Sequence, residues 1–280
     1  MNASAPAKVN LCLFLGPARA DGRHELVTVL QSVSLADELK LTVLDAGPDE
    51  VICPGVEGPN LVSAALDALR SAGWVGPPVR IEVDKRIPVA AGMGGGSADA
   101  AAVLRLADEL EPVPDELISR IAAGLGADVP SQLRPGLWLG TGAGELVEAL
   151  EPLAPHALVI VPSRFQLSTA DVYREADRLG LPREDVDLQT RQAELRAALR
   201  AGGRLPASLL VNDLEPATRS LCPAVDEALT ALRDARAEQA FVCGSGPTCA
   251  GVWWGDPEAA AGAARALAGR FPGAVKVHPV

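Results

Sequence analysis

The segment Pro88-Val89-Ala90-Ala91-Gly92-Met93-Gly94-Gly95-Gly96-Ser97-Ala98, the glycine loop, stands between a clear strand pattern and a clear helix pattern. Before it, Val79–Asp84 alternates between apolar and polar side chains, which predicts a half-buried strand. After it, residues 97–110 are rich in alanine, the residue with the lowest cost in a helix. We therefore predict a strand–loop–helix unit with Ser97 as the N-cap of the helix. The glycines would let an anion approach the backbone and the positive end of the helix dipole.

Similar periodicities predict strands and helices along the rest of the chain. The predicted strands cover residues 8–15, 26–34, 38–44, 79–84, 137–139, 145–147, 157–161, 240–243, 249–254 and 274–277. The glycine-rich residues 140–144 between two of these strands predict a hairpin. The predicted helices cover residues 60–72 (capped by Asn60), 97–110, 114–123, 169–179, 193–201, 223–235 and 257–268, and residues 182–192 form a polar surface loop. Strands followed by helices in each half predict an α+β protein of two domains with a cleft between them. We place an N-terminal domain with the glycine loop at residues 1–151 and a C-terminal α+β domain at residues 152–280.

The composition is that of a folded protein with little attraction for nucleic acid. Of the 280 residues, 48% are hydrophobic and 22% charged, so a well-packed core is expected. The formal net charge is -11, and so acidic a protein is a poor partner for a phosphate backbone. The apolar run at residues 9–15 is too short to cross a bilayer, so we expect no membrane association. Five cysteines without a C-x-x-C pair indicate neither a disulfide framework nor a zinc site, and we expect a cytoplasmic protein.

Two well-known phosphate-binding motifs do not fit the glycine loop. A P-loop needs Lys followed by Ser or Thr directly after its last glycine, whereas Ser97 and Ala98 follow here. A dinucleotide-binding motif needs an acidic residue about 20 positions later, at the end of a strand. Glu116 lies at that distance, but within a predicted helix. The residues alone leave two alternatives, a flexible turn and a phosphate-binding loop of another kind.

Five further segments accompany the glycine loop over almost the whole chain. They are residues 5–11 (APAKVNL), 19–24 (RADGRH), 126–130 (GADVP), 212–216 (NDLEP) and 244–248 (GSGPT). Together they resemble, in the expected order, the GHMP kinases, a superfamily that includes galactokinase, homoserine kinase and mevalonate kinase. Within it they look most like the branch that phosphorylates a cytidine diphosphate ester of methylerythritol in the non-mevalonate isoprenoid route. The alternatives are a kinase of the homoserine or mevalonate type and a non-catalytic binding protein of this fold. The oligomeric state is left open.

The resemblance implies that ATP and the acceptor meet in the cleft between the domains, with Mg²⁺ present and the glycine loop around the ATP phosphates. It also implies catalytic roles for Lys8 and Asp128. Asp128 would accept the proton of the acceptor hydroxyl, and Lys8 would keep that carboxylate ionised or stabilise the transferring phosphoryl group. From position alone, Asp128 would be a turn residue and Lys8 a solvated residue of an edge strand. Residues 244–248 would join two strands as a turn and pack near the glycine loop.

Four residues are implied in acceptor binding. Asn10 lies two positions after Lys8, so on a strand both side chains share one face. The segment with Arg23 and His24 would contact the cytosine, but this branch usually has an aromatic residue, commonly tyrosine, where Arg23 stands. A guanidinium plane can stack on a base in a similar way. Tyr173 would be the second aromatic of this pocket. From pattern alone, Tyr173 is a half-buried helix residue and His24 a surface loop residue.

Overall fold

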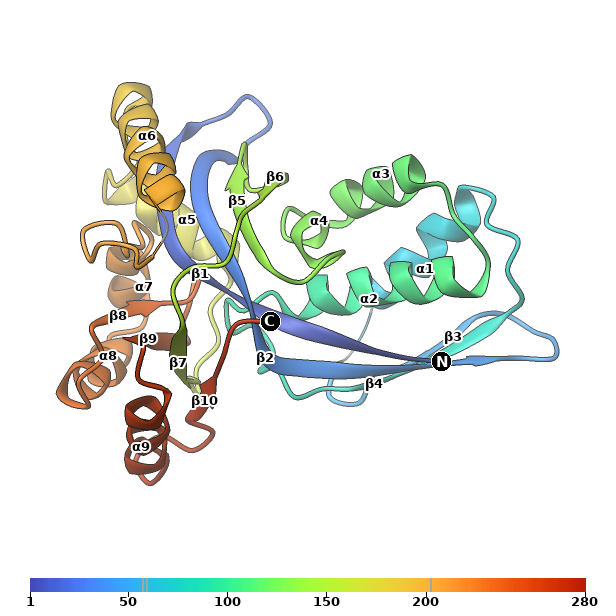
Figure 1. Ribbon diagram of the computed structural model, residues 1–280. Coiled ribbons are helices and arrows are strands. Elements are labelled where there is room, and N and C mark those ends of the chain that lie inside the picture. The colour runs from blue at the N-terminus through green and yellow to red at the C-terminus, as the bar shows by residue number, and fades with distance from the viewer. Residues whose placement is uncertain (57, 59, 202) are drawn as a thin grey trace. The chain divides into compact units, whose positions relative to one another are not determined.

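The computed structural model describes residues 1–56, 58, 60–201 and 203–280, and it confirms a mixed α+β fold (Figure 1). The strands are β1 (Asn2–Ala18), β2 (His24–Val43), β3 (Glu50–Ile52), β4 (Val79–Asp84), β5 (Leu137–Thr141), β6 (Leu146–Ala149), β7 (His156–Val161), β8 (Gln239–Val242), β9 (Cys249–Trp254) and β10 (Val275–Val277). The helices are α1 (Leu61–Ser71), α2 (Gly95–Leu110), α3 (Asp115–Leu125), α4 (Val129–Gln132), α5 (Thr169–Arg178), α6 (Asp185–Ala201), α7 (Glu215–Leu221), α8 (Val225–Asp234) and α9 (Pro257–Ala268). Within the described residues, none of the helices combines the length and apolar character needed to span a bilayer.

The elements form two compact units that are not continuous in sequence. Unit 1 contains residues 1–7, 35–89 and 94–135, and unit 2 contains residues 8–34, 90–93 and 136–280. This grouping differs from a single boundary at residue 151, because the long strands β1 and β2 each contribute residues to both units. The glycine loop is divided as well, since its residues 90–93 belong to unit 2. A domain boundary at residue 151 stays a prediction.

Unit 1 is built on the strand order β3-β4-β2. Ile81 of β4 lies opposite Leu41 in an antiparallel pair with β2, and opposite Val51 in a parallel pair with β3. Val79, Ile81 and Val83 are buried while the residues between them are more exposed, which confirms the predicted alternation. The buried face packs with apolar residues of α1 and α2, and α1 to α4 lie on one side of these strands (Figure 1). Each large side chain buried there stabilises the layer by roughly 1.5–3 kcal/mol.

The ends of α1 follow from local sequence signals. The side chain of Asn60 accepts a hydrogen bond of 3.0 Å from the backbone N–H of Ser63, which confirms Asn60 as the N-cap. At the other end, Gly73 follows the C-cap Ala72 with φ of +90°, a conformation that glycine adopts without strain. Both ends were predictable because a cap depends on residues within one helical turn.

Unit 2 contains the antiparallel sheet β10-β7-β9-β8. Every residue of β7 and β9 is buried, which explains why these strands are apolar apart from His156 and do not alternate. On one face, Leu229 of α8 and Ala264 of α9 share a buried cluster with Val159 of β7. The first half of β2 pairs with β5, and β5 pairs with β6 as the predicted hairpin. A further cluster joins Val172 of α5 to Leu13 of β1.

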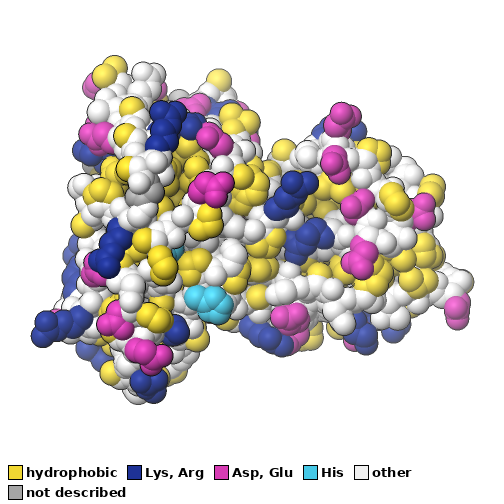
Figure 2. All heavy atoms as spheres, in the orientation of Figure 1, with side chains coloured by type: hydrophobic (Ala, Val, Ile, Leu, Met, Phe, Trp, Pro, Cys, Tyr) yellow, Lys and Arg dark blue, Asp and Glu magenta, His cyan; other side chains and the backbone are white. Residues whose placement is uncertain are grey.

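Charges of both signs are mixed on the surface of unit 2. On the face drawn in Figure 2, acidic and basic side chains alternate over α8 and α9. The first turn of α8 carries Asp226 and Glu227, and its last turn carries Arg233. This arrangement is favourable for the helix dipole, because anions stabilise the N-terminal end and cations the C-terminal end.

The prediction of a surface loop at residues 182–192 is wrong, because α6 begins at Asp185. The buried residues of α6 are Leu188 and Leu195, seven positions apart, so only a narrow apolar stripe marks the helix. Asp185 and Asp187 stand in its first turn, where acidic side chains favour the helix dipole. The first half of α6 has one buried residue, Leu188, among charged residues, so its sequence resembles a loop, whereas the predicted helix at residues 193–201 is confirmed.

Candidate active site

The glycine loop enters α2 through a left-handed residue. Gly94 has φ of +68° and occupies the N-cap position, without a capping bond from a side chain. The prediction of Ser97 as N-cap is wrong, because the turn at Gly94 starts the helix at Gly95 and places Ser97 within the first turn. The first backbone N–H groups of a helix have no acceptor within the helix. The start of α2 therefore presents a set of donors that suits an anion.

Gly92 contacts the turn at residues 244–248. A Cβ atom at Gly92 would lie 2.1 Å from the carbonyl oxygen of Cys243 and 2.9 Å from the backbone nitrogen of Gly246. The turn joins β8 to β9 and is closed by a bond of 2.7 Å from the Gly246 N–H to the Cys243 carbonyl oxygen. The predicted turn between two strands and its packing near the glycine loop are both confirmed.

Lys8 and Asn10 are buried together on β1, with exposed fractions of 5% and 3%. The Lys8 Nζ donates to Asn10 Oδ1 at 2.8 Å and to the Gly92 carbonyl oxygen at 3.3 Å. Asn10 in turn donates from Nδ2 to the Thr28 hydroxyl at 2.8 Å. The shared face of Lys8 and Asn10 is confirmed, and the reading of Lys8 as a solvated edge residue is wrong. The ammonium is held against the backbone of the glycine loop.

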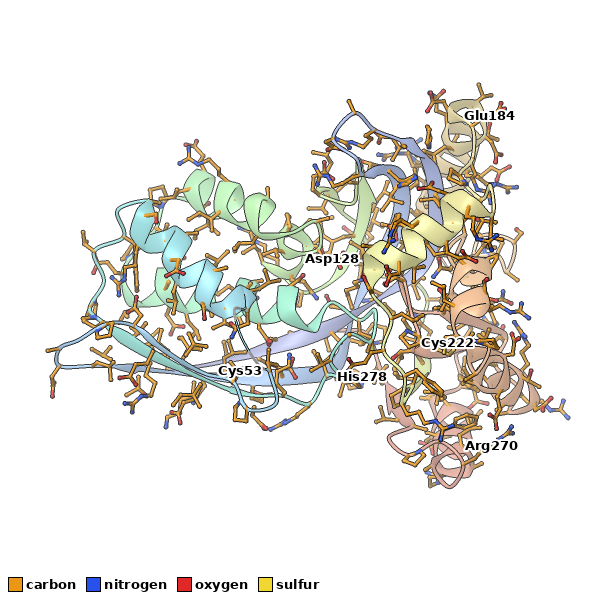
Figure 3. All side chains as sticks on the ribbon, turned by 180° about the vertical axis from the view of Figure 1, so that it is seen from behind. Cys53, Asp128, Glu184, Cys222, Arg270 and His278 are labelled. Atoms are coloured by element: carbon orange, nitrogen blue, oxygen red, sulfur yellow. The ribbon has the colours of Figure 1, made fainter. Side chains whose placement is uncertain are left out.

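Asp128 stands at the N-cap position of α4 in unit 1 (Figure 3). Its side chain does not cap α4, and the residue is half-buried. Its backbone carbonyl accepts a bond of 2.9 Å from the Ser131 hydroxyl, which helps to fix the turn that carries the carboxylate. Lys8 belongs to unit 2, and the pairing of Lys8 with Asp128 stays a prediction.

The residues implied in cytosine binding lie in unit 2. Arg23 is half exposed and donates from Nε and a terminal nitrogen to Asp21 Oδ2, at 3.0 and 2.9 Å. His24 is buried, with Nε2 at 2.8 Å from Asp177 Oδ1, so its reading as a surface loop residue is wrong. The ring centroids of His24 and Tyr173 are 5.5 Å apart, with the planes tilted by 40°. The structure brings His24 and Tyr173 together and fixes the orientation of Arg23.

A buried charge network beside the glycine loop was not predicted. In unit 1, Lys85 Nζ donates to Asp37 and, at 2.7 Å, to Asp99 Oδ2. Asp37 also accepts the backbone N–H groups of residues 86 and 87. Asp99 shares the same lysine but keeps an Oδ1 atom with no partner among the described residues. Burial therefore raises the pKa of Asp99 to about 6, although Lys85 opposes the shift. The signal in the sequence was an aspartate on the buried side of an alanine-rich helix.

Asn212 ties the segment 212–216 to the turn at residues 244–248. Its Nδ2 donates to the carbonyl oxygens of Val242 and Gly244, at 2.8 and 2.7 Å. Its Oδ1 accepts the backbone N–H of Leu214 at 2.9 Å. Asn212 is buried and uses both ends of its amide, so it fixes the turn that contacts Gly92.

Among the described residues, no group of three or more His, Cys, Asp or Glu side chains is arranged to hold a metal ion. Mg²⁺ in phosphoryl-transfer sites is commonly bound through one or two carboxylates together with the phosphates of the substrate. Binding of that kind does not require a cage made of protein ligands alone.

Sequence patterns of known families match two parts of the chain. GHMP kinases N terminal domain matches residues 60–136, and GHMP kinases C terminal matches residues 188–273. A 4-diphosphocytidyl-2-C-methyl-D-erythritol kinase of Streptomyces coelicolor is 42% identical over 257 residues, which cover 88% of this chain and 85% of that protein. The crystal structure of a 4-(cytidine 5'-diphospho)-2C-methyl-D-erythritol kinase has a TM-score of 0.81 at 34% identity, over 100% of both chains. A homoserine kinase from Cytophaga hutchinsonii has a TM-score of 0.74 at 22% identity, over 100% of this chain and 94% of that one, which shows a shared fold alone.

Proposed function

Because this chain belongs to the GHMP kinases, we propose that it transfers the γ-phosphoryl group of ATP to a hydroxyl of 4-diphosphocytidyl-2-C-methyl-D-erythritol. The acceptor oxygen forms a bond to the γ-phosphorus, the bond to the bridging oxygen breaks, and ADP leaves. The observation that carries the proposal is 42% identity to a kinase of this name over 88% of the chain. The product would serve the synthesis of isoprenoid precursors. A cytoplasmic location is part of the proposal, and the five cysteines are free thiols, as in a reducing compartment.

The start of α2 fits the phosphates of ATP. Gly94 supplies the left-handed turn, and the N–H groups of the first helical turn follow it. At Gly96 a Cβ atom would meet nothing nearer than a Leu61 carbon at 3.7 Å, so the backbone is open to an approaching ligand. The Ser97 hydroxyl in the same turn would reach a phosphate oxygen or a water of hydrated Mg²⁺. The bound metal would supply charge neutralisation at the phosphate oxygens.

Lys8 and Asp128 take the catalytic roles in the proposal. The Lys8 ammonium is oriented by Asn10 and by the Gly92 carbonyl, which places a fixed positive charge beside the glycine loop. Such a charge stabilises the phosphoryl group as it is transferred. Asp128 would accept the proton that leaves the acceptor hydroxyl, a step that typically contributes ~10²–10⁴-fold to the rate.

Arg23, His24 and Tyr173 would hold the cytosine. Asp21 fixes the guanidinium of Arg23 through two bonds, while half of the side chain remains exposed. A planar guanidinium held in this way can stack on the base in place of the aromatic residue usual in this branch. His24 is fixed by Asp177, and its ring lies against Tyr173, so His24 supports the Tyr173 ring from the buried side.

The test is ADP release from the purified protein with ATP, Mg²⁺ and one of three acceptors. We expect turnover with 4-diphosphocytidyl-2-C-methyl-D-erythritol and background rates with homoserine and mevalonate. Faster turnover of homoserine or mevalonate would move the assignment to another branch of the GHMP kinases. Background rates with all three would favour the non-catalytic binding protein.

A further inference from the structure

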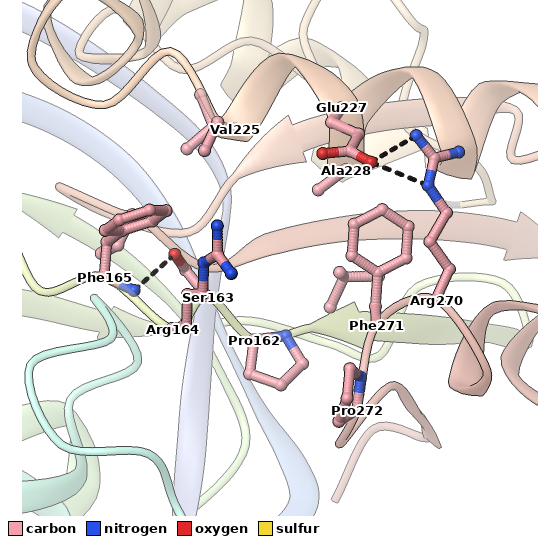
Figure 4. Close-up of a pocket in the computed structure, with 13 residues that line it drawn as sticks. Pro162, Ser163, Arg164, Phe165, Val225, Glu227, Ala228, Arg270, Phe271 and Pro272 are labelled. Carbon is pink, nitrogen blue, oxygen red and sulfur yellow. Dashed lines mark hydrogen bonds and ion pairs between the residues drawn. The ribbon is translucent and has the colours of Figure 1, made fainter.

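Unit 2 contains a cavity of about 660 Å³ whose lining includes none of the residues proposed to bind ATP or the acceptor or to act in catalysis (Figure 4). It lies where the segment after β7 faces the start of α8 and the turn after α9. A volume of this size falls within the range of ~300–1,000 Å³ usual for small-molecule sites. The cavity is therefore large enough for a small metabolite rather than for a single ion.

The charge of the lining is positive although the whole chain is acidic. The lining contains two basic residues, Arg164 and Arg270, and one acidic residue, Glu227. The chain as a whole has a formal net charge of -11. Arg270 is already neutralised, because its terminal nitrogen lies 2.6 Å from Glu227 Oε1. In the described part of the chain, Arg164 has no hydrogen-bond or ion-pair partner. One guanidinium thus remains available to an anionic group, which it can bind through two parallel hydrogen bonds.

Two phenylalanine rings give the cavity an apolar surface next to this charge. Phe165 is 44% exposed, which is unusual for a large aromatic side chain, and Phe271 is half-buried. The Arg164 guanidinium carbon lies 5.0 Å from the centroid of the Phe165 ring. In Figure 4 the Arg164 guanidinium lies between the two rings, and Arg270 turns away toward Glu227. The free cation and the exposed ring are therefore adjacent and face the same space.

We propose that this cavity binds a small organic anion with a flat apolar body. The anionic group, a carboxylate, sulfonate or phosphate, pairs with Arg164. The apolar body contacts Phe165 and Phe271 and removes their rings from water. Ser163, also in the lining, offers a hydroxyl for a further hydrogen bond.

The cavity adjoins two segments of the kinase site. The lining segment that ends at Phe165 leads to α5, which carries Tyr173, and the lining also includes Pro247 of the turn at residues 244–248. These two segments are joined by the hydroxyls of Thr169 and Ser245, 3.0 Å apart. A ligand in the cavity thus contacts the segment that leads to α5 and the turn at residues 244–248. It does so without occupying the glycine loop.

The test uses 2-naphthoate as the probe, observed by ligand-detected NMR on the full chain. We expect a dissociation constant on the order of 1 mM, the affinity usual for a ligand of this size. Neutral 2-naphthamide, which lacks the charge, and inorganic sulfate, which lacks the apolar body, should each bind at least about 10-fold more weakly. Saturating ATP should leave the binding of 2-naphthoate unchanged.

Two exposed substitutions and one control locate the site. Arg164→Ala and Phe165→Ala should each weaken 2-naphthoate binding about 10-fold or more, since each removes one half of the recognition. Arg200→Ala changes an exposed arginine of α6 outside the lining and should have no effect. The thermal midpoint of each variant shows that it is folded. Four results would each overturn the proposal. They are unchanged binding of 2-naphthoate by Arg164→Ala, equally strong binding of 2-naphthamide, displacement of 2-naphthoate by ATP, and no detectable binding of 2-naphthoate.

Discussion

Gly92 lies so close to Cys243 that no side chain fits between them, since a Cβ atom at Gly92 would lie 2.1 Å from the Cys243 carbonyl oxygen. Gly92 also has φ of +74°, so both its contacts and its backbone require glycine. At Gly94 the backbone conformation, with φ of +68°, requires glycine, and at Gly96 the space is open. The glycines of one loop thus serve different purposes: contact with the turn, entry into the helix, and access for a ligand.

Gly92→Ala is expected to destabilise the protein by roughly 2–5 kcal/mol, because the methyl group collides with backbone atoms and the left-handed conformation is strained. Urea unfolding measures the change. Gly262→Ala is the matched control, since Gly262 lies within α9 with nothing within 4 Å of an added Cβ atom. It should stabilise the protein by ~0.5–1 kcal/mol. Equal stability of Gly92→Ala and wild type would contradict the close contact.

Asp128→Asn is expected to lower kcat by ~10²–10⁴-fold, because an amide cannot accept the proton of the acceptor hydroxyl. The affinity for ATP should change little, since the proposed contacts of the phosphates lie at the start of α2. Steady-state kinetics and a separate ATP titration give the two values. Asp115→Asn, at an exposed position of α3, should behave as wild type. A near-normal kcat for Asp128→Asn would remove Asp128 from the role of base.

Arg23→Ala is expected to raise the KM for the acceptor about 3–30-fold with little change in kcat, because a stacking contact stabilises ground and transition states alike. Asp21→Asn should have a smaller effect in the same direction, since it loosens the guanidinium without removing it. Arg174→Ala, at an exposed position of α5, is the control. An unchanged KM in Arg23→Ala would mean that the cytosine is bound without this residue.

Asp99→Asn is expected to remove a pH dependence of stability. In the folded protein burial raises the pKa of Asp99 to about 6, against an ordinary value of 3.8. As the pH rises from about 4 to about 6, the unfolded chain releases this proton while the folded chain keeps it. The wild type therefore loses stability relative to Asp99→Asn over this interval, and the difference stays constant above about pH 7.

Urea unfolding of wild type and Asp99→Asn at several pH values tests this directly. Asp115→Asn, in which an exposed carboxylate is replaced, should follow the wild-type curve. Parallel curves for wild type and Asp99→Asn would show that Asp99 titrates alike in the folded and unfolded states. In that case the Lys85 ammonium would stabilise the charged carboxylates of both Asp37 and Asp99 enough to offset their burial.

Asn212→Ala is expected to destabilise the protein by roughly 2–5 kcal/mol, because two carbonyl oxygens and one N–H lose a buried partner. Asn60→Ala provides a comparison with an asparagine that makes one principal contact at the surface of a helix end. It should cost about 1 kcal/mol, the usual value of an N-cap. Similar costs for the two variants, measured by urea unfolding, would show that the Asn212 amide does not hold the turn.

Local features of this fold could be predicted from the sequence. The alternation of β4 and the cap at Asn60 depend on residues a few positions apart. The hairpin of β5 and β6 was predicted from its glycine-rich connection for the same reason. In contrast, only the second half of α6 was predicted as a helix, because the whole helix has just two buried residues, Leu188 and Leu195.

Less of the candidate site could be predicted from the sequence, because its contacts join residues that are far apart along the chain. Lys8 is buried because it bonds to a carbonyl 84 positions away, and no local pattern contains that information. Similarly, His24 meets Asp177 across 153 positions. Lys8, Asp128 and Tyr173 were singled out through resemblance to a family, whereas their own spacing favoured ordinary structural roles. The network of Lys85, Asp37 and Asp99 lay outside every motif and was not predicted.

The division of β1 and β2 between the units limits how this protein can be recombined with its relatives. Each unit is assembled from three separate parts of the chain, which meet at positions 7/8, 34/35, 89/90, 93/94 and 135/136. A single crossover at residue 151 would give a unit 2 whose first part comes from one parent and whose sheet β10-β7-β9-β8 comes from the other. Chimeras that inherit a whole unit from one parent must therefore exchange the chain at all of these junctions.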